Sequence, residues 1–82
     1  MPTFQYTVDD EPYSTSEHTL TARQILQLAG KDPNNYYLKQ IKGQHQESYK
    51  DKLDEPIQMH QHMKFITIYN GSTGVSWKVY DG

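Results

Sequence analysis

The chain has 82 residues, a formal net charge of −2 and no cysteine. A chain this short forms at most one domain with a small core, and the lack of cysteine excludes a disulfide scaffold, a thiolate zinc site and a cysteine nucleophile. No apolar run approaches the ~20 residues of a membrane span, and the lysines are scattered among acids. The composition predicts a soluble cytoplasmic domain that binds neither membranes nor nucleic acids, and the N-terminus has no signal-peptide pattern.

The first elements expected are a hairpin and a loop. Phe4, Tyr6 and Val8 alternate with polar residues, which is the pattern of a half-buried strand. The acids and the proline of residues 9–12 form a turn cluster, so residues 13–15 can return antiparallel. Residues 16–18 then lead as a loop into a helix.

A short amphipathic helix is predicted over residues 21–29. Thr19 or Thr21 can cap its N-terminus by accepting a hydrogen bond from a free backbone N–H. Gly30 stands where a left-handed C-terminal cap belongs, and Pro33 follows soon after. The apolar stripe of this helix consists of Ala22, Ile25, Leu26, Leu28 and Ala29.

The second half of the chain predicts four more segments that contribute to a sheet or its core. Residues 36–41 form a strand, Lys42 and Gly43 a tight turn, and the polar residues 44–49 an edge strand. A charged loop follows, and residues 57–59 make a short turn whose apolar side chains fill the core. Residues 64–69 are apolar on both faces, which favours a central strand.

This order of elements indicates an α+β domain with one helix between two hairpins. It is the pattern of a ubiquitin-like β-grasp, a mixed four- to five-stranded sheet with one helix across it, whose last strand lies beside the first. We expect the domain to cover residues 1–69 and a flexible C-terminal arm to cover residues 70–82. The predicted core comprises Phe4, Tyr6, Val8, Ile25, Leu26, Leu28, Leu38, Ile57 and Phe65.

Several blocks of the sequence carry a family likeness. They are TLTARQILQLAG at 19–30, NYYL at 35–38, ESYKD at 47–51, DEPIQMH at 54–60 and MKFITI at 63–68. Over residues 4–69 the chain resembles the bacterial multiubiquitin domain, a family of ubiquitin-like units encoded beside an activating enzyme, a conjugating enzyme and a JAB-type metalloprotease. The chain departs from classical ubiquitin in two ways: it ends in one glycine rather than two, and its arm is longer and contains Trp77. The family's name implies tandem copies, whereas this chain has one unit.

The resemblance implies a protein modifier. Its terminal Gly82 would be the acyl donor, first as an adenylate and then as a thioester on a partner enzyme, before amide formation with an amine on a target protein. Gly has no Cβ, so such a terminus can enter a narrow channel. We expect the partner enzymes to read the residues before it, namely Trp77, Val79, Tyr80 and Asp81.

The sheet surface supplies a second set of candidate residues. Tyr37, Ile41, Ile66 and Ile68 could form an apolar patch on the face away from the helix, the usual docking surface of a ubiquitin-like domain, or they could be core. Ile66 and Ile68 are the partner-binding candidates there.

No residue pattern predicts catalysis, a metal or a cofactor. His60 and His62 lack an acid or thiol at ligand spacing, and the adjacent acids stand in turns. The sequence therefore favours two functions: a conjugated modifier that is not itself an enzyme, or a non-covalent ubiquitin-like adaptor whose C-terminus is not conjugated.

Overall fold

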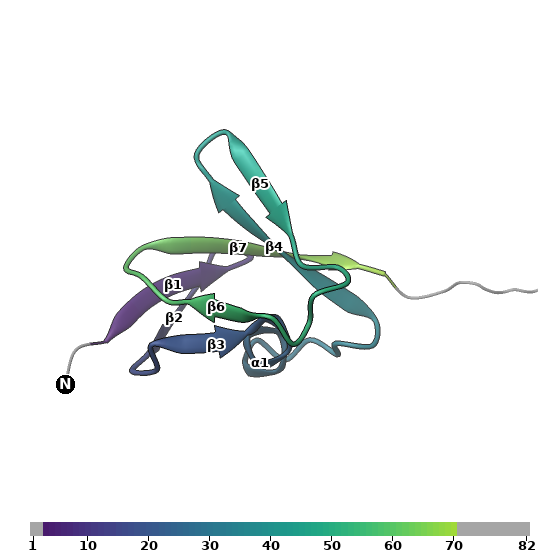
Figure 1. Ribbon diagram of the computed structural model, residues 1–82, viewed down its shortest axis with the longest axis horizontal. Coiled ribbons are helices and arrows are strands. Elements are labelled where there is room, and N and C mark those ends of the chain that lie inside the picture. Colours follow the sequence, from purple (N-terminus) through teal and green to yellow (C-terminus); the bar gives the residue numbers. More distant parts are fainter. Residues whose placement is uncertain (1–2, 71–82) are drawn as a thin grey trace, which may run out of the picture.

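The computed structural model describes residues 3–70 of the chain. These residues form strands and one short helix, arranged along the sequence as Figure 1 shows. The elements are β1 (Phe4–Val8), β2 (Glu11–Thr15), β3 (Thr19–Thr21), α1 (Ala22–Leu28), β4 (Tyr36–Lys42), β5 (His45–Ser48), β6 (Pro56–Gln58) and β7 (Met63–Tyr69).

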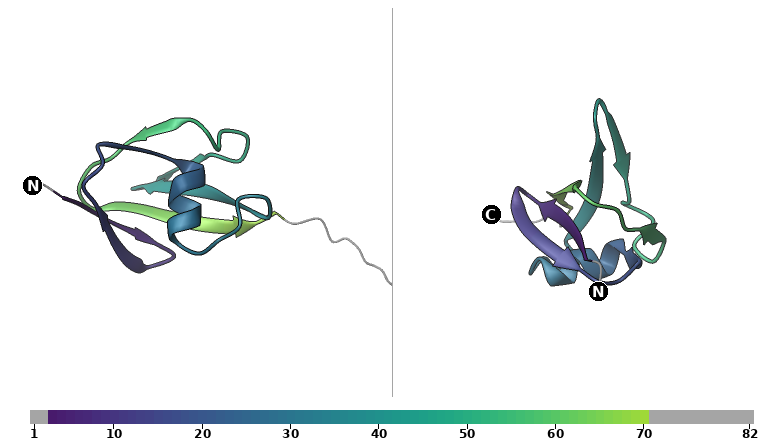
Figure 2. Two further views of the ribbon diagram at one scale, coloured as in Figure 1. Left: turned by 90° about the horizontal axis from the view of Figure 1, so that it is seen from below. Right: turned by 90° about the vertical axis from the view of Figure 1, so that its left-hand side faces the viewer.

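The main sheet is mixed and five-stranded, in the order β2-β1-β7-β4-β5. The last strand, β7, lies in the middle, parallel to β1 and antiparallel to β4. The helix α1 crosses one face of this sheet (Figure 2). An α+β fold with one helix in residues 3–70, a mixed sheet and a central last strand confirms the predicted β-grasp-like architecture.

A second, two-stranded sheet pairs β3 with β6. The sequence predicts only a loop and a turn here, so both strands were missed. Leu20 and Ile57 face each other in this pair and are both buried. The pair adds their side chains to the core beside α1. No helix within residues 3–70 is long and apolar enough to cross a membrane.

The β1–β2 turn is fixed by a contact with the central strand. Asp9 and Asp10 both have positive φ, 53° and 68°, as a two-residue hairpin turn requires, and Asp tolerates that region better than most residues. The Asp9 carboxylate also accepts hydrogen bonds from the Thr67 backbone N–H at 2.9 Å and from the Thr67 hydroxyl at 2.5 Å. The predicted turn acids therefore have a structural role, which is to join the first hairpin to β7.

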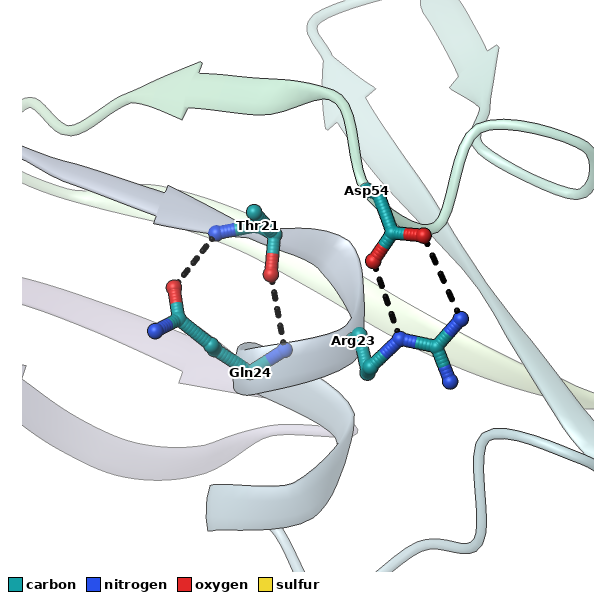
Figure 3. A network of polar contacts seen from close by, with 4 residues as sticks. All are labelled: Thr21, Arg23, Gln24 and Asp54. Carbon is teal, nitrogen blue, oxygen red and sulfur yellow. Dashed lines mark hydrogen bonds and ion pairs between the residues drawn. The ribbon is translucent and has the colours of Figure 1, made fainter.

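Capping defines both ends of α1, as predicted. The Thr21 hydroxyl accepts a hydrogen bond from the Gln24 N–H, and the Gln24 side chain accepts one from the Thr21 N–H (Figure 3). Gly30 follows the helix with φ +76°. Arg23 bonds Asp54 at 3.0 Å and thereby links the helix to the loop before β6. Of the two candidate caps, Thr21 serves, because Thr19 lies at the start of β3.

Thr21→Ala is expected to lower the free energy of unfolding by about 1 kcal/mol, because the Gln24 N–H would lose its side-chain acceptor. Chemical denaturation followed by circular dichroism measures this change. Thr19→Ala is the matched control, since Thr19 is exposed and makes no capping bond. Equal losses for the two variants would contradict the role of the capping box.

The core confirms most of the residues predicted for it and corrects one. Leu28 is 59% exposed, because it lies two positions beyond Leu26 and therefore on another side of the helix. Phe4 is half-buried and packs against the edge of the core. Leu20, Tyr49 and Met63 are core residues that the prediction omitted. The buried apolar set is Tyr6, Val8, Leu20, Ala22, Ile25, Leu26, Leu38, Tyr49, Ile57, Met59, Met63 and Phe65.

Candidate docking surface

The two faces of the main sheet differ sharply in burial. Side chains alternate along each strand, so Phe65 on β7 and Leu38 on β4 point to the inner face, where α1 packs (Figure 2). Both are fully buried. Ile66 and Ile68 on β7 point to the outer face and are half-buried. The sequence left open whether these two isoleucines are core or surface, and the fold places them on the outer face.

The pairing of β4 with β7 gathers the predicted surface residues. Tyr37 stands opposite Ile68, and Ile41 lies on the same face two positions beyond Lys39, which stands opposite Ile66. Cross-strand neighbours of this kind lie within side-chain contact distance. We call Tyr37, Ile41, Ile66 and Ile68 the outer patch. All four side chains are half-buried.

Three lysines lie in or beside the outer patch, Lys39 within it and Lys50 and Lys64 next to it. The Lys50 ammonium lies 5.7 Å from the centre of the Tyr37 ring, and the Lys39 ammonium lies 3.3 Å from the Gln46 amide oxygen. Lys64 reaches only an exposed contact with Asp10 at 4.0 Å, and such pairs contribute little. The patch therefore combines four apolar side chains with Lys39 in its middle row and with Lys50 and Lys64 at its margins, which suits a partner whose apolar side chains stand beside carboxylates.

A shallow depression continues the outer face across β7, β1 and β2. Its volume is about 610 Å³, and both polar and apolar side chains form its wall. Gln5, Thr7, Pro12, Ser14, His62 and Lys64 are among the residues that line it. The outer face thus offers a partner a hollow beside the patch rather than a flat surface.

Aromatic side chains mark the end of β7. Tyr69 is 57% exposed, and its ring meets that of Tyr36 edge-on with centroids 5.3 Å apart. The Lys31 ammonium lies 5.1 Å from the centre of the Tyr36 ring. Sequence reasoning did not single out these residues. The signal available was the presence of a tyrosine at the start of one predicted strand and at the end of its neighbour.

The arm residues predicted to act in conjugation lie outside the described residues. These are Gly82 and the recognition residues Trp77, Val79, Tyr80 and Asp81. The last described residue, Asn70, donates its backbone N–H to the Asn35 carbonyl at 2.5 Å. The structure therefore fixes the point from which the arm continues, beside Tyr36 and Tyr69.

The remaining titratable groups in this part of the molecule are paired in the fold, exposed or buried in the core. The Arg23 guanidinium donates a hydrogen bond to Asp54 and holds the pKa of that carboxyl below its usual range. His60 and His62 are exposed, and within residues 3–70 no three His, Asp or Glu side chains gather as metal ligands. Burial raises the pKa of Tyr49, whose hydroxyl lies 3.4 Å from the side-chain oxygen of the buried Gln40.

Comparison with protein-family models, curated proteins and solved structures finds no match to this chain. The features of the molecule that bear on its function are therefore its fold, the outer patch and the sequence that follows Asn70.

Proposed function

We propose that this protein is a ubiquitin-like modifier that partner enzymes activate at Gly82 and join to amines on target proteins. The observation that carries the proposal is the place of β7. This strand occupies the centre of the β-grasp-like sheet, ends at Tyr69 and continues directly into the segment that contains Gly82. A rigid domain for recognition is thereby joined to a carboxylate for chemistry.

The chemistry assigns every catalytic group to a partner. The Gly82 carboxylate attacks the α-phosphate of ATP, so that an acyl adenylate forms and pyrophosphate leaves. A cysteine thiolate of the activating enzyme then attacks the adenylate and releases AMP. The thiol belongs to the enzyme, because this chain contains no cysteine. After transfer to a conjugating enzyme, a target amine attacks the thioester and releases the thiol. A JAB-type metalloprotease would remove the modifier by hydrolysing the final amide bond.

A reconstituted activation assay tests the proposal. The full chain is incubated with ATP and a cognate activating enzyme, and the products are separated with and without reducing agent. We expect a complex of enzyme and modifier that disappears on reduction, and an acyl adenylate detectable by mass spectrometry. Absence of both products with an enzyme shown to be active would contradict the proposal.

A second candidate function is a non-covalent adaptor, which the outer patch favours. Apolar side chains with lysines among and beside them form an interaction surface whether or not the C-terminus is conjugated. This function becomes the better account if partners bind the outer face while no adenylate or thioester forms.

Ile68→Ala is expected to weaken binding of a partner that docks on the outer patch about tenfold, or about 1.4 kcal/mol. The reason is that Ile68 and Tyr37 form a cross-strand apolar pair that such a partner would cover. Isothermal titration calorimetry measures the affinity. Leu28→Ala is the matched control, because it truncates an exposed apolar side chain on α1, which covers the other face of the sheet. Equal affinities for the wild type and the Ile68 variant would remove the patch from the docking surface.

Trp77→Ala is expected to leave the free energy of unfolding nearly unchanged and to weaken binding to the partner enzymes by about 2 kcal/mol or more, as truncation of an aromatic anchor does. Denaturation and titration with the activating enzyme measure the two effects separately. A large loss of stability with unchanged affinity would make Trp77 a structural residue of the domain instead.

A further inference from the structure

The main sheet has two edge strands, β2 and β5. The alternation of hydrogen-bonded and non-hydrogen-bonded pairs along each hairpin shows which backbone groups each edge presents. In an antiparallel pair, residues alternate between positions bonded to the neighbouring strand and positions whose N–H and C=O point away from it. The β4–β5 hairpin closes with Lys42 opposite His45 across a two-residue turn that starts at Gly43, φ +61°. The closing pair of such a turn is hydrogen-bonded.

The free edge of β5 is therefore defined by Gln46 and Ser48. Each stands opposite a β4 residue at a position that is not hydrogen-bonded, so its N–H and C=O point away from the sheet. No other strand pairs with β5 in residues 3–70. The hairpin also projects beyond the rest of the sheet, as Figure 1 shows. No proline or covering element of the described chain blocks this edge.

The opposite edge, β2, is protected. In the β1–β2 hairpin, Val8 and Glu11 form the closing, hydrogen-bonded pair. The same alternation therefore points the backbone N–H and C=O groups of positions 12 and 14, which are Pro12 and Ser14, away from β1. Proline has no N–H, so one of the two outward positions of β2 cannot donate a hydrogen bond. Proline on an edge strand is a known way to prevent pairing with another chain. The two edges of this sheet thus differ in their capacity to accept a further strand.

We propose that β5 pairs with β5 of a second copy of this chain, antiparallel about a two-fold axis at Gln46. Among registers that bring outward backbone groups together, this one sets Gln46 opposite its own copy and His45 opposite Glu47 of the other copy. A shift by one hydrogen-bonding step would set Glu47 opposite Glu47, two like charges, and like charges directly opposite are destabilising. A pairing centred on Ser48 would run past the end of β5.

Neighbouring charges support the same register. Lys42 bonds Glu47 at 2.9 Å within one copy, and Lys42 stands opposite His45. In the proposed pair, Lys42, His45 and the Glu47 of the other copy lie in one row across the strands. Each carboxylate then has a cationic side chain on its own chain and an imidazole on the other, so the edge is complementary to itself.

The pairing has a consequence for the outer patch. A two-fold axis perpendicular to the sheet keeps both outer faces on the same side, so two copies present their patches together. The two β4 strands would lie about 14 Å apart, three strand spacings of about 4.8 Å. A partner with two docking segments could then bind both copies with greater avidity than either alone.

Single cysteines in the full chain test the register, because the sequence contains no other cysteine. Gln46→Cys places two Cα atoms about 5.5 Å apart in the proposed pair, within disulfide range. Ser48→Cys lies on the same face, but its two Cα atoms would be about 14 Å apart. With oxidised glutathione, we expect Gln46→Cys to form covalent dimers at least about tenfold faster than Ser48→Cys, because pairing raises the effective concentration. Equal rates would overturn the register.

Analytical ultracentrifugation over a concentration series tests the association itself. The wild-type chain should show a reversible dimer, and Gln46→Pro should dissociate it by removing the central N–H. Ser14→Pro makes the same change at an outward position of β2 and should leave the dimer intact, so a folded, monomeric Ser14 variant would overturn the proposal. A wild-type chain that stays monomeric at all concentrations would also overturn it. If the Gln46 amide of that monomer were protected from hydrogen exchange, another segment of the same chain would be the strand that pairs with β5.

Discussion

Leu26→Ala is expected to lower the free energy of unfolding by about 2–5 kcal/mol, the range for a leucine truncated in a core. Leu26 is fully buried, on the side of α1 that packs against the sheet. The total free energy of unfolding is roughly 0.05–0.15 kcal/mol per residue, so in a domain of this size the loss is a large fraction of the total. We therefore expect a large part of the population to unfold at physiological temperature. Chemical denaturation with linear extrapolation measures the change.

Leu28→Ala is the matched control, because it removes the same atoms from the same helix. Leu28 is 59% exposed, so the substitution creates no cavity, and alanine is the stronger helix former. We expect the free energy of unfolding to change by less than about 0.5 kcal/mol, as for most surface substitutions. If Leu28→Ala cost as much as Leu26→Ala, the assigned face of α1 would be wrong.

Gly82→Val and deletion of Gly82 are each expected to abolish transfer to the partner enzymes while the fold stays intact. A branched side chain next to the reacting carboxylate would occupy the space through which an enzyme channel must pass the terminus, and deletion presents the Asp81 carboxylate instead. Gly82→Ala should be milder, because one methyl group is a small addition. Single-turnover formation of the reducible thioester measures the three effects.

Two measurements keep this result interpretable. Circular dichroism and thermal melting of the Gly82 variants should match those of the wild type, because Gly82 lies twelve residues beyond Asn70, the last residue of the described fold. A chain extended past Gly82 should not react unless a protease first removes the extension. Thioester formation by the deletion variant at the wild-type rate would exclude Gly82 as the acyl donor.

The fold was largely predictable because local signals agreed with the tertiary structure. Thr21 and Gly30 stand at the two ends of α1, and alternation in β1 identified Tyr6 and Val8 as inward residues. The apolar run of β7 indicated a central strand, and the sheet order confirms it. Each of these features depends on residues within a few positions of one another, which is the range over which sequence patterns carry information.

What the sequence did not predict depends on contacts between distant segments. The strands β3 and β6 have three residues each, too few to show a period, and they form because Leu20 and Ile57 meet in the core. Leu28 is a different case: it was assigned to the core by its apolar character, although its spacing of two residues from Leu26 places it on another side of the helix. Tyr49 looked like an edge residue, yet it is buried beside Gln40.

The candidate docking surface was predictable in its centre and not at its rim. Ile66 and Ile68 are recognisable because a central strand with apolar residues on both faces must present some of them outward. Lys39 shares the face of Tyr37 by the alternation of side chains along β4, whereas the position of Lys50 over the Tyr37 ring depends on the loop after β5, which no local pattern specifies. The conjugation residues beyond Asn70 stay predictions, since they lie outside the described part of the chain.

The parallel pairing of β1 with β7 also determines how the domain bears mechanical load. The chain enters β1 at one end of the sheet and leaves β7 at the other (Figure 1), and the two strands are direct neighbours. Force applied between Phe4 and Tyr69 therefore loads the bonds between these strands in shear, all at once. Pulling apart the β1–β2 hairpin would instead open its bonds one after another. Resistance to forced unfolding is set by the unfolding rate, and in this domain that rate will depend on the direction of the pull.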